Sequence, residues 1–188
     1  MKAVGIIPAR LSASRFPNKP MALLHGMPMI GHCYHRTRLT TGLEATYVAT
    51  CDEQIAEYIR GIGGRAIMTS TSHTRATTRT AEALQHIERE TGEPVDIIVM
   101  VQGDEPLIRP ETIAETLIHF EDSSVQIVNV NCAPWRSFAT ATMSRWSSTK
   151  TGTLSTSHAN LSLLLGRVSR EFPCSCRQEL SRSGGIRC

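Results

Sequence analysis

The sequence is poor in aromatic residues, at 5%, and it contains no apolar run near the ~20 residues that a membrane-spanning helix needs. The first ten residues, MKAVGIIPAR, hold one Lys and an apolar run that is too short for the core of a secretion signal. Without such a signal the six Cys are expected to stay reduced, and those in the first two-thirds have no metal-site spacing. These absences predict a cytoplasmic protein without a membrane span.

The length of 188 residues, with 40% hydrophobic and 20% charged residues, suits one α/β domain, alone or with a short additional segment. Acidic residues become scarce after residue 133. Residues 1–133 hold 15 acidic and 12 basic side chains, whereas residues 134–188 hold 2 acidic and 8 basic ones, a net charge of +6. A basic excess of this kind is typical of a nucleic-acid-binding segment, or of a segment that was never selected to fold.

Residues 1–133 alternate between segments typical of strands and segments typical of helices. The expected strands are 3–8, 45–50, 65–68, 97–101 and 125–130, and the expected helices are 29–39, 52–62, 78–90 and 110–120. The most apolar strand, 97–101, is expected at the centre of the sheet. This alternation predicts a three-layer α/β fold, in which helices cover both faces of a mainly parallel sheet. Ligands of such sheets bind beyond the carboxyl ends of the strands.

A compact cationic loop follows the first expected strand. Residues 8–20 read PARLSASRFPNKP, in which Arg10, Arg15 and Lys19 are separated by small residues and prolines. Small residues let backbone N–H groups approach an anion, and Arg binds phosphate oxygens through two parallel hydrogen bonds. A phosphate-binding loop and a solvated basic loop both fit this composition. The Walker motif is excluded because its glycines are missing.

The segment Gln102-Gly103-Asp104-Glu105-Pro106 follows directly after the expected central strand. A carboxylate at the end of a buried strand, beside a Gly that lets a ligand approach, suits a divalent metal that bridges to phosphates. An ordinary Asp-containing turn would fit an isolated GDEP equally well. The expected position of this segment, at the same rim of the sheet as the cationic loop, favours the metal-binding interpretation.

A third polar segment, HTRATTR at residues 73–79, precedes an expected helix. Its hydroxyl groups and the helix N-terminus could hold a base or a phosphate. A helix-capping cluster with a solvated Arg fits the same spacing.

Four segments, in this order and spacing, resemble the sugar-acid cytidylyltransferases: IIPARLSASRFPNKPMALLHGMPMIGH, VATCDEQIAEYIRGIGG, HTRATTRTAEAL and VMVQGDEPLI. The similarity covers residues 2–131 and is greatest to the branch that activates 3-deoxy-manno-octulosonate (Kdo) for lipopolysaccharide synthesis. The sibling CMP-sialic acid synthetases share the fold and the first loop but usually lack this form of QGDEP. Two features depart from the pattern: Asn18 stands where a Gly is usual, and residues 75–78 replace a Ser-Gly-Thr-acid run.

The resemblance implies a Rossmann-like nucleotide-diphospho-sugar transferase fold and the transfer of CMP from CTP to a sugar acid, with release of pyrophosphate. Mg²⁺ and protein cations would neutralise the charge that develops on the phosphates. A homodimer is implied for the intact family, and nucleic acid is not an expected partner. The motifs assign these roles: Arg10, Lys19 and Asp104 catalytic, Arg10, Arg15, Lys19 and Arg79 on the nucleotide, Gln102 on the cytosine edge, and Asp104 on Mg²⁺.

The similarity stops after Asn131, and residues 134–188 match nothing expected next: a sheet insertion with sugar-acid contacts and dimer surface, then a second Mg²⁺ carboxylate. Read one base earlier with free synonymous codons, residues 142–167 can be decoded as NDVKMVVDKNGDALYFSREPIPSPWKG, which resembles the family's next segment. We therefore interpret residues 134–188 as an out-of-frame, poorly ordered tail of a truncated enzyme with little or no activity. An inactive CTP-binding remnant and a sialic-acid-type synthetase are the alternatives. The apolar run Leu161–Leu165 is expected to promote aggregation rather than to join the core.

Overall fold

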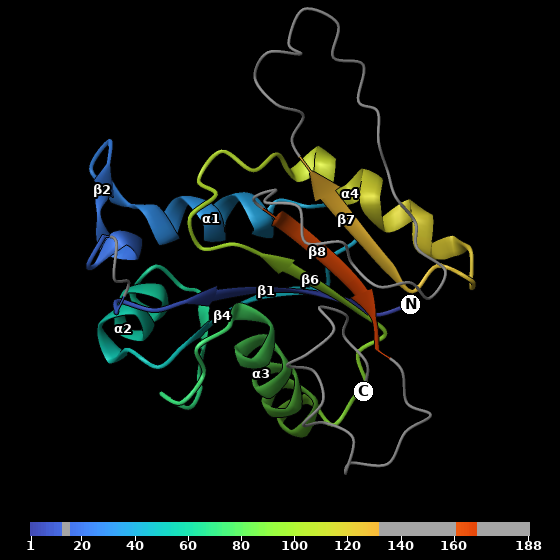
Figure 1. Ribbon diagram of the computed structural model, residues 1–188, viewed down its shortest axis with the longest axis horizontal. Coiled ribbons are helices and arrows are strands. Elements are labelled where there is room, and N and C mark those ends of the chain that lie inside the picture. Colours follow the sequence, from blue (N-terminus) through green and yellow to red (C-terminus); the bar gives the residue numbers. More distant parts are fainter. Residues whose placement is uncertain (13–15, 132–160, 169–188) are drawn as a thin grey trace, which may run out of the picture.

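The computed structural model describes residues 1–12, 16–131 and 161–168, and it contains one main sheet and a small hairpin (Figure 1). The main sheet has the strand order β5-β4-β1-β6-β8-β7. Its strands are β1 (Ala3–Ala9), β4 (Ala45–Thr50), β5 (Arg65–Met68), β6 (Ile97–Val101), β7 (Ile127–Asn131) and β8 (Leu161–Arg167). The hairpin pairs β2 (Leu23–Leu24) with β3 (Met27–Pro28). The helices are α1 (Met29–Arg38), α2 (Glu53–Gly61), α3 (Ala76–Thr91) and α4 (Pro110–Ile118), with single 3₁₀ turns η1 (Lys19–Met21) and η2 (His119–Glu121).

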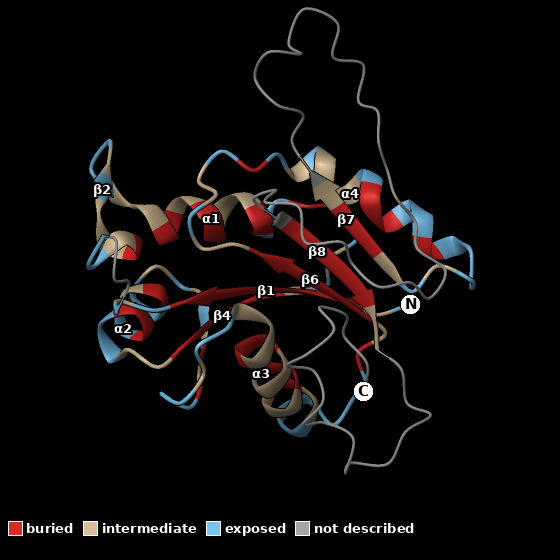
Figure 2. Ribbon diagram, viewed as in Figure 1, coloured by how far each residue is buried: buried red, intermediate tan, exposed pale blue. Residues whose placement is uncertain are grey.

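The centre of the sheet is built from strands that are apolar along their whole length. Every residue of β1 and of β6 is buried (Figure 2), and the two strands pair in parallel, with Val4 opposite Ile98. Strands buried on both faces read as continuous apolar runs, because each side chain meets a covering layer. The prediction that residues 97–101 form a central strand is therefore confirmed.

Helices cover both faces of the sheet, as predicted. In Figure 1, α1 and α4 lie on one side of the sheet and α3 lies on the other. One apolar cluster joins α1, α2 and α4 to the sheet, for instance through Ile30, Ile59 and Ile113. A second cluster joins α3 to the opposite face through Leu84 and Ile87. The mainly parallel three-layer α/β fold is confirmed, with β8 as its antiparallel member.

Strand β8 corrects one expectation. It lies between β6 and β7, antiparallel to both, with Leu163, Leu164 and Leu165 almost completely buried. The expectation that this apolar run stays outside the core is wrong. The edge of β6 offers unpaired backbone N–H and C=O groups, and an uncharged run of leucines can satisfy them while filling both adjoining layers. Residues 132–160 and 169–188 lie outside the described ranges, so the reading-frame interpretation of the tail stays a prediction.

The element boundaries differ from the expected ones by a few residues at most. Helix α3 begins at Ala76 instead of Thr78, and β7 begins at Ile127 instead of Val125. Helix α4 begins at Pro110, as predicted, since a first-turn position needs no backbone N–H. Among the residues that the structure describes, none of the helices is long and apolar enough to cross a bilayer.

Candidate active site

A pocket of about 260 Å³ opens at the carboxyl end of β1 and β6, where the start of α3 closes its third side. This is the edge at which parallel α/β sheets bind their ligands. The pocket is lined by Pro8, Ala9, Arg10, Lys19, Pro20, His73, Arg75, Ala76, Arg79, Gln102, Gly103 and Asp104. Segments from all three polar motifs therefore meet at one place. Of the six predicted site residues, five line the pocket, and Arg15 lies outside the described residues.

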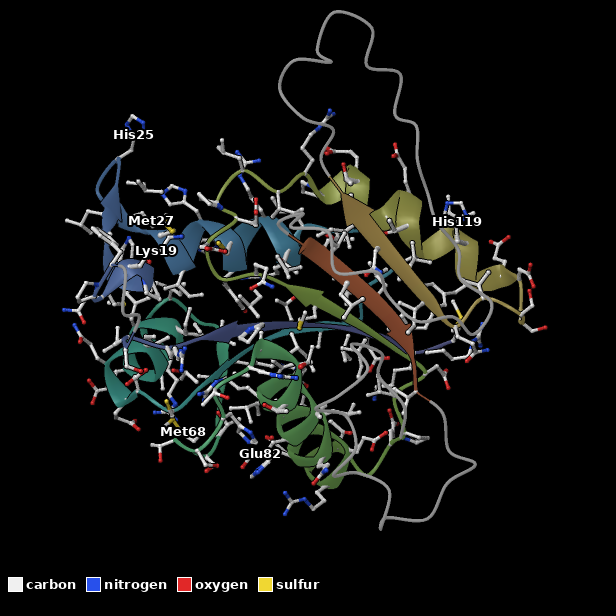
Figure 3. The ribbon with its side chains drawn as sticks, in the orientation of Figure 1. Lys19, His25, Met27, Met68, Glu82 and His119 are labelled. Carbon is white, nitrogen blue, oxygen red and sulfur yellow. The ribbon has the colours of Figure 1, made fainter. Side chains whose placement is uncertain are left out.

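The cationic loop is closed by two backbone contacts. The N–H of Leu11 donates to Oδ2 of Asp52 at 2.7 Å, and the N–H of Asn18 donates to the carbonyl of Leu11 at 3.1 Å. Asn18 has φ 59° and ψ 19°, a left-handed conformation that Gly and Asn adopt most easily. This explains why Asn can occupy the position where the resemblance leads one to expect Gly. The turn delivers Lys19 to the rim of the pocket (Figure 3).

Asp52 supports the cationic loop in a way that the sequence did not reveal. It occupies the N-cap position of α2, but its side chain makes no capping hydrogen bond. Its carboxylate instead anchors Leu11 in the cationic loop. The only available signal was its location after β4, at the same edge of the sheet as the loop.

An ion pair joins the cationic loop to the GDEP turn. Nζ of Lys19 lies 2.7 Å from Oδ2 of Asp104, and the two side chains are 38% and 49% exposed. Lysine was predicted to face phosphates and aspartate to face Mg²⁺. Because the two side chains touch, one ligand that carries both phosphates and a bound Mg²⁺ could contact Lys19 and Asp104 at the same time.

Gly103 allows the turn to approach the end of β1. A Cβ added at this position would lie 3.0 Å from the carbonyl oxygen of Pro8 and 3.5 Å from the Cβ of Ala9. The 3.0 Å distance to the Pro8 oxygen is shorter than an ordinary van der Waals contact, so a side chain at residue 103 would push the turn away from β1. The sequence predicts that this Gly admits a ligand, and the structure adds that it admits the neighbouring strand.

The electrostatics around the turn favour a cation. Burial raises the pKa of Glu105, and the neighbouring Asp104 carboxylate raises it further, while Lys19 acts in the opposite direction. Below the turn, burial raises the pKa of the Cys33 thiol to about 12, which excludes this residue as a thiolate nucleophile. The described part of the site therefore offers charged side chains of both signs to a ligand.

The donor set fits a magnesium ion that is carried mostly by a phosphate ligand. Mg²⁺ prefers carboxylate and phosphate oxygens and usually keeps only one or two protein carboxylates. Asp104 offers one exposed carboxylate in a pocket that is lined by four cationic side chains, Arg10, Lys19, Arg75 and Arg79. In the described ranges no three His, Cys, Asp or Glu side chains gather into a potential metal cage. A bound phosphate chain and water would have to supply the other ligands.

Arg79 borders the pocket, but its guanidinium group is engaged with the protein. The side chain is 2% exposed and donates to Oγ1 of Thr69 at 2.5 Å and to the carbonyl of His73 at 3.2 Å. Gln102, in contrast, is only half-buried at the pocket wall. The two predicted nucleotide contacts therefore differ in how freely they could meet a ligand.

A family model described as Cytidylyltransferase matches residues 4–159 of the chain. The chain belongs to this family. The match extends beyond Asn131, the last residue of the motif resemblance described above. It includes the cationic loop, the start of α3 and the GDEP turn, so every residue that lines the pocket falls within it.

Curated relatives of this cytidylyltransferase chain share 40–48% of their residues with it over their aligned parts. The mitochondrial 3-deoxy-manno-octulosonate cytidylyltransferase of Arabidopsis thaliana is 48% identical over 112 residues, which are 60% of this chain and 37% of the relative. The enzyme of the same name from Parabacteroides distasonis is 42% identical over 73% of this chain and 52% of its own length. An 8-amino-3,8-dideoxy-manno-octulosonate cytidylyltransferase from Shewanella is 42% identical over 64% and 48%. The chain thus spans about half the length of these relatives, or less.

Solved structures agree with the family assignment. A CMP:2-keto-3-deoxy-manno-octonic acid synthetase, solved in complex with CTP, has a TM-score of 0.68 and 27% identity, and covers 89% of this chain and 74% of its own. A 4-diphosphocytidyl-2C-methyl-D-erythritol synthase has a TM-score of 0.53 at 14% identity, which supports the fold alone.

Proposed function

We propose that this chain carries the nucleotide-binding half of a CTP:sugar-acid cytidylyltransferase, with Kdo as the acceptor. The observation that supports this most is the meeting of Arg10, Lys19, Gln102 and Asp104 in one pocket at the carboxyl edge of the sheet. A triphosphate needs cations, its metal needs a carboxylate, and a base needs a polar edge to pair with. The pocket offers all three within one cavity.

Each residue has a role that follows from its chemistry. Arg10, Arg15 and Lys19 hold the triphosphate, because charge-assisted hydrogen bonds to phosphate are the strongest that neutral pH allows. The Gln102 amide both donates and accepts, as the cytosine edge requires, since that edge presents an amino group beside acceptors. Asp104 holds Mg²⁺, which supplies neutralisation of the phosphate charge when it is bound.

The proposed reaction is an attack by the anomeric hydroxyl of the sugar acid on the α-phosphorus of CTP. A new oxygen–phosphorus bond forms to the sugar, and the bond to the oxygen that bridges the α- and β-phosphates breaks. Pyrophosphate leaves with that oxygen, and the proton of the attacking hydroxyl passes to water. In this proposal Arg10 and Lys19 stabilise the negative charge on the departing phosphates, which is the main task in phosphoryl transfer.

Relatives named for Kdo and relatives named for its 8-amino analogue are equally similar to this chain in sequence, at 42% identity. We favour Kdo on the form of the QGDEP motif, and we propose that the 188-residue chain binds CTP with little turnover. The cytoplasmic location and the homodimer stay predictions.

The test is nucleotide selectivity, measured by isothermal titration of CTP, UTP and ATP into the chain at one Mg²⁺ concentration. We expect CTP to bind most tightly, and Gln102→Ala to reduce the preference for CTP over UTP. Gln54→Ala, on the exposed side of α2, is the matched control. Equal affinities for the three nucleotides would contradict the proposal.

A further inference from the structure

Residues 69–75 connect β5 to α3 and form one wall of the pocket through His73 and Arg75. The wall is not part of a helix or strand. The Thr69 N–H donates to the Thr50 carbonyl at 2.8 Å, and side-chain contacts hold the residues that follow. Two residues of α3, Arg79 and Glu82, supply most of those contacts. They lie three positions apart, on the side of the helix that faces the connection.

Arg79 fixes the two ends of the wall to the helix. Its Nη1 donates to Oγ1 of Thr69 and to the carbonyl of Ser70, and its Nη2 donates to the carbonyl of His73. The planar guanidinium can serve several acceptors at fixed angles, which an ammonium group cannot do. At 2% exposure the guanidinium is itself buried, so these oxygen acceptors offset the cost of removing its charge from water.

Glu82 holds the same wall from the next part of the helix (Figure 3). Its Oε2 accepts the N–H of Ser70 at 2.9 Å and contacts Nε2 of His73. Burial acts to raise the pKa of Glu82, but the Ser70 N–H and the His73 ring outweigh it and lower the pKa. An ionised Glu82 only accepts hydrogen bonds, so the proton of the His73 ring is placed on Nε2. The backbone and the ring of His73 are therefore both held by α3.

We propose that Arg79 and Glu82 are positioning residues that clamp residues 69–75 and so hold His73 and Arg75 at the edge of the nucleotide pocket. The inference rests on the proposed nucleotide-binding function. It changes the role of Arg79, which the resemblance assigns to the nucleotide itself. Glu82 does not line the pocket, so the proposal has it act on CTP binding through the wall and not by direct contact.

The test compares Glu82→Ala with Glu90→Ala, which removes an exposed carboxylate from the same helix. Two quantities are measured in each variant: hydrogen exchange of the Ser70 amide without nucleotide, and the dissociation constant of CTP with Mg²⁺. We expect Glu82→Ala to accelerate Ser70 exchange and to weaken CTP binding roughly tenfold, the effect of one charge-assisted hydrogen bond. Glu90→Ala should change neither quantity. Glu82→Gln should recover part of both, because its amide oxygen still accepts.

Arg79→Lys separates positioning from direct contact. If Arg79 contributes only its charge to the phosphates, Arg79→Lys should bind CTP like the parent. If Arg79 clamps the wall, Lys cannot reproduce the geometry of the guanidinium, and Arg79→Lys should weaken CTP binding nearly as much as Arg79→Met. Unchanged Ser70 exchange in Glu82→Ala would overturn the clamp. Faster exchange with unchanged CTP affinity would overturn its positioning role. If the parent chain bound no CTP, the proposed function would fail, and the exchange data alone would then decide whether the clamp exists.

Discussion

The ion pair between Lys19 and Asp104 places two groups with different proposed ligands in contact with each other. A complex of CTP with Mg²⁺ would replace this ion pair by two contacts, one between Lys19 and a phosphate and one between Asp104 and the metal. Binding of the metal alone would instead have to compete with the Lys19 ammonium. The pair therefore couples the affinity for the metal to the presence of the nucleotide.

This coupling predicts opposite effects of one substitution on two ligands. Lys19→Met should weaken CTP binding by about 1.5–3 kcal/mol, because a charge-assisted contact is lost. It should strengthen the binding of Mn²⁺ alone, followed by electron paramagnetic resonance, because Asp104 is released. Lys2→Met removes the same charge before β1, at the opposite edge of the sheet, and serves as the control. If Lys19→Met weakened Mn²⁺ binding, the competition between Lys19 and the metal would be disproved.

Gly103 and Gly61 are a matched pair for testing the close approach of the turn to β1. Gly103→Ala should lower the free energy of unfolding by about 1–3 kcal/mol, since its Cβ would crowd the Pro8 carbonyl. Gly61→Ala meets no atom within 4 Å and should be neutral or slightly stabilising. Urea denaturation measures both, and equal stabilities of the two variants would show that the turn is not held against β1.

At the scale of elements, α3 contributes to the pH dependence of stability through Glu82. The pKa of Glu82 is lower in the folded chain than its ordinary value, so its stabilising effect is complete above the ordinary value. The effect disappears as the pH falls through the folded value. The difference in unfolding free energy between the parent and Glu82→Gln should therefore be largest near neutral pH and shrink in acid. A difference that grew on acidification would mean that Glu82 is not held ionised.

Strand β8 leads to its own prediction, because Leu163 and Leu165 belong to the apolar cluster that α4 covers. Leu165→Ala should cost about 2–5 kcal/mol of unfolding free energy, the usual range for a buried leucine. Leu107 is 77% exposed, so Leu107→Ala should have almost no effect in the same denaturation experiment. Equal effects of the two substitutions would contradict the placement of β8 in the sheet.

The elements that the sequence predicted well are those whose pattern is local. Residues 97–101 are apolar without interruption, and the Pro at residue 110 marks a helix start, so both features can be recognised without knowing the neighbours. The contact of Asp52 with Leu11, and that of Lys19 with Asp104, join residues 41 and 85 positions apart. No local pattern contains such pairs. Strand β8 was missed for the same reason: a short run of leucines becomes a strand only where an open sheet edge receives it.

At the scale of the whole molecule, every residue that lines the pocket falls within the part of the chain that the family model matches. The chain nevertheless spans only about half of the curated relatives. Mg²⁺ needs few protein ligands when a triphosphate is present, so this half should suffice to bind CTP with its metal. Transfer to a sugar acid also needs a positioned acceptor, and the loss of positioning alone can cost about 7–11 kcal/mol of barrier. Binding and turnover should therefore be separable in this chain.

The most direct test is a calorimetric titration of CTP into the parent chain and the Asp104→Asn variant, each with Mg²⁺ and with EDTA. We predict that the parent binds CTP more tightly with Mg²⁺ and that the variant loses this difference, because Asp104 holds the metal against the phosphates. Glu57→Gln, an exposed change of equal charge on α2, should behave like the parent. CTP affinity that is independent of Mg²⁺ in the parent, or unaltered in Asp104→Asn, would contradict the central claim that this pocket is a metal-dependent CTP site.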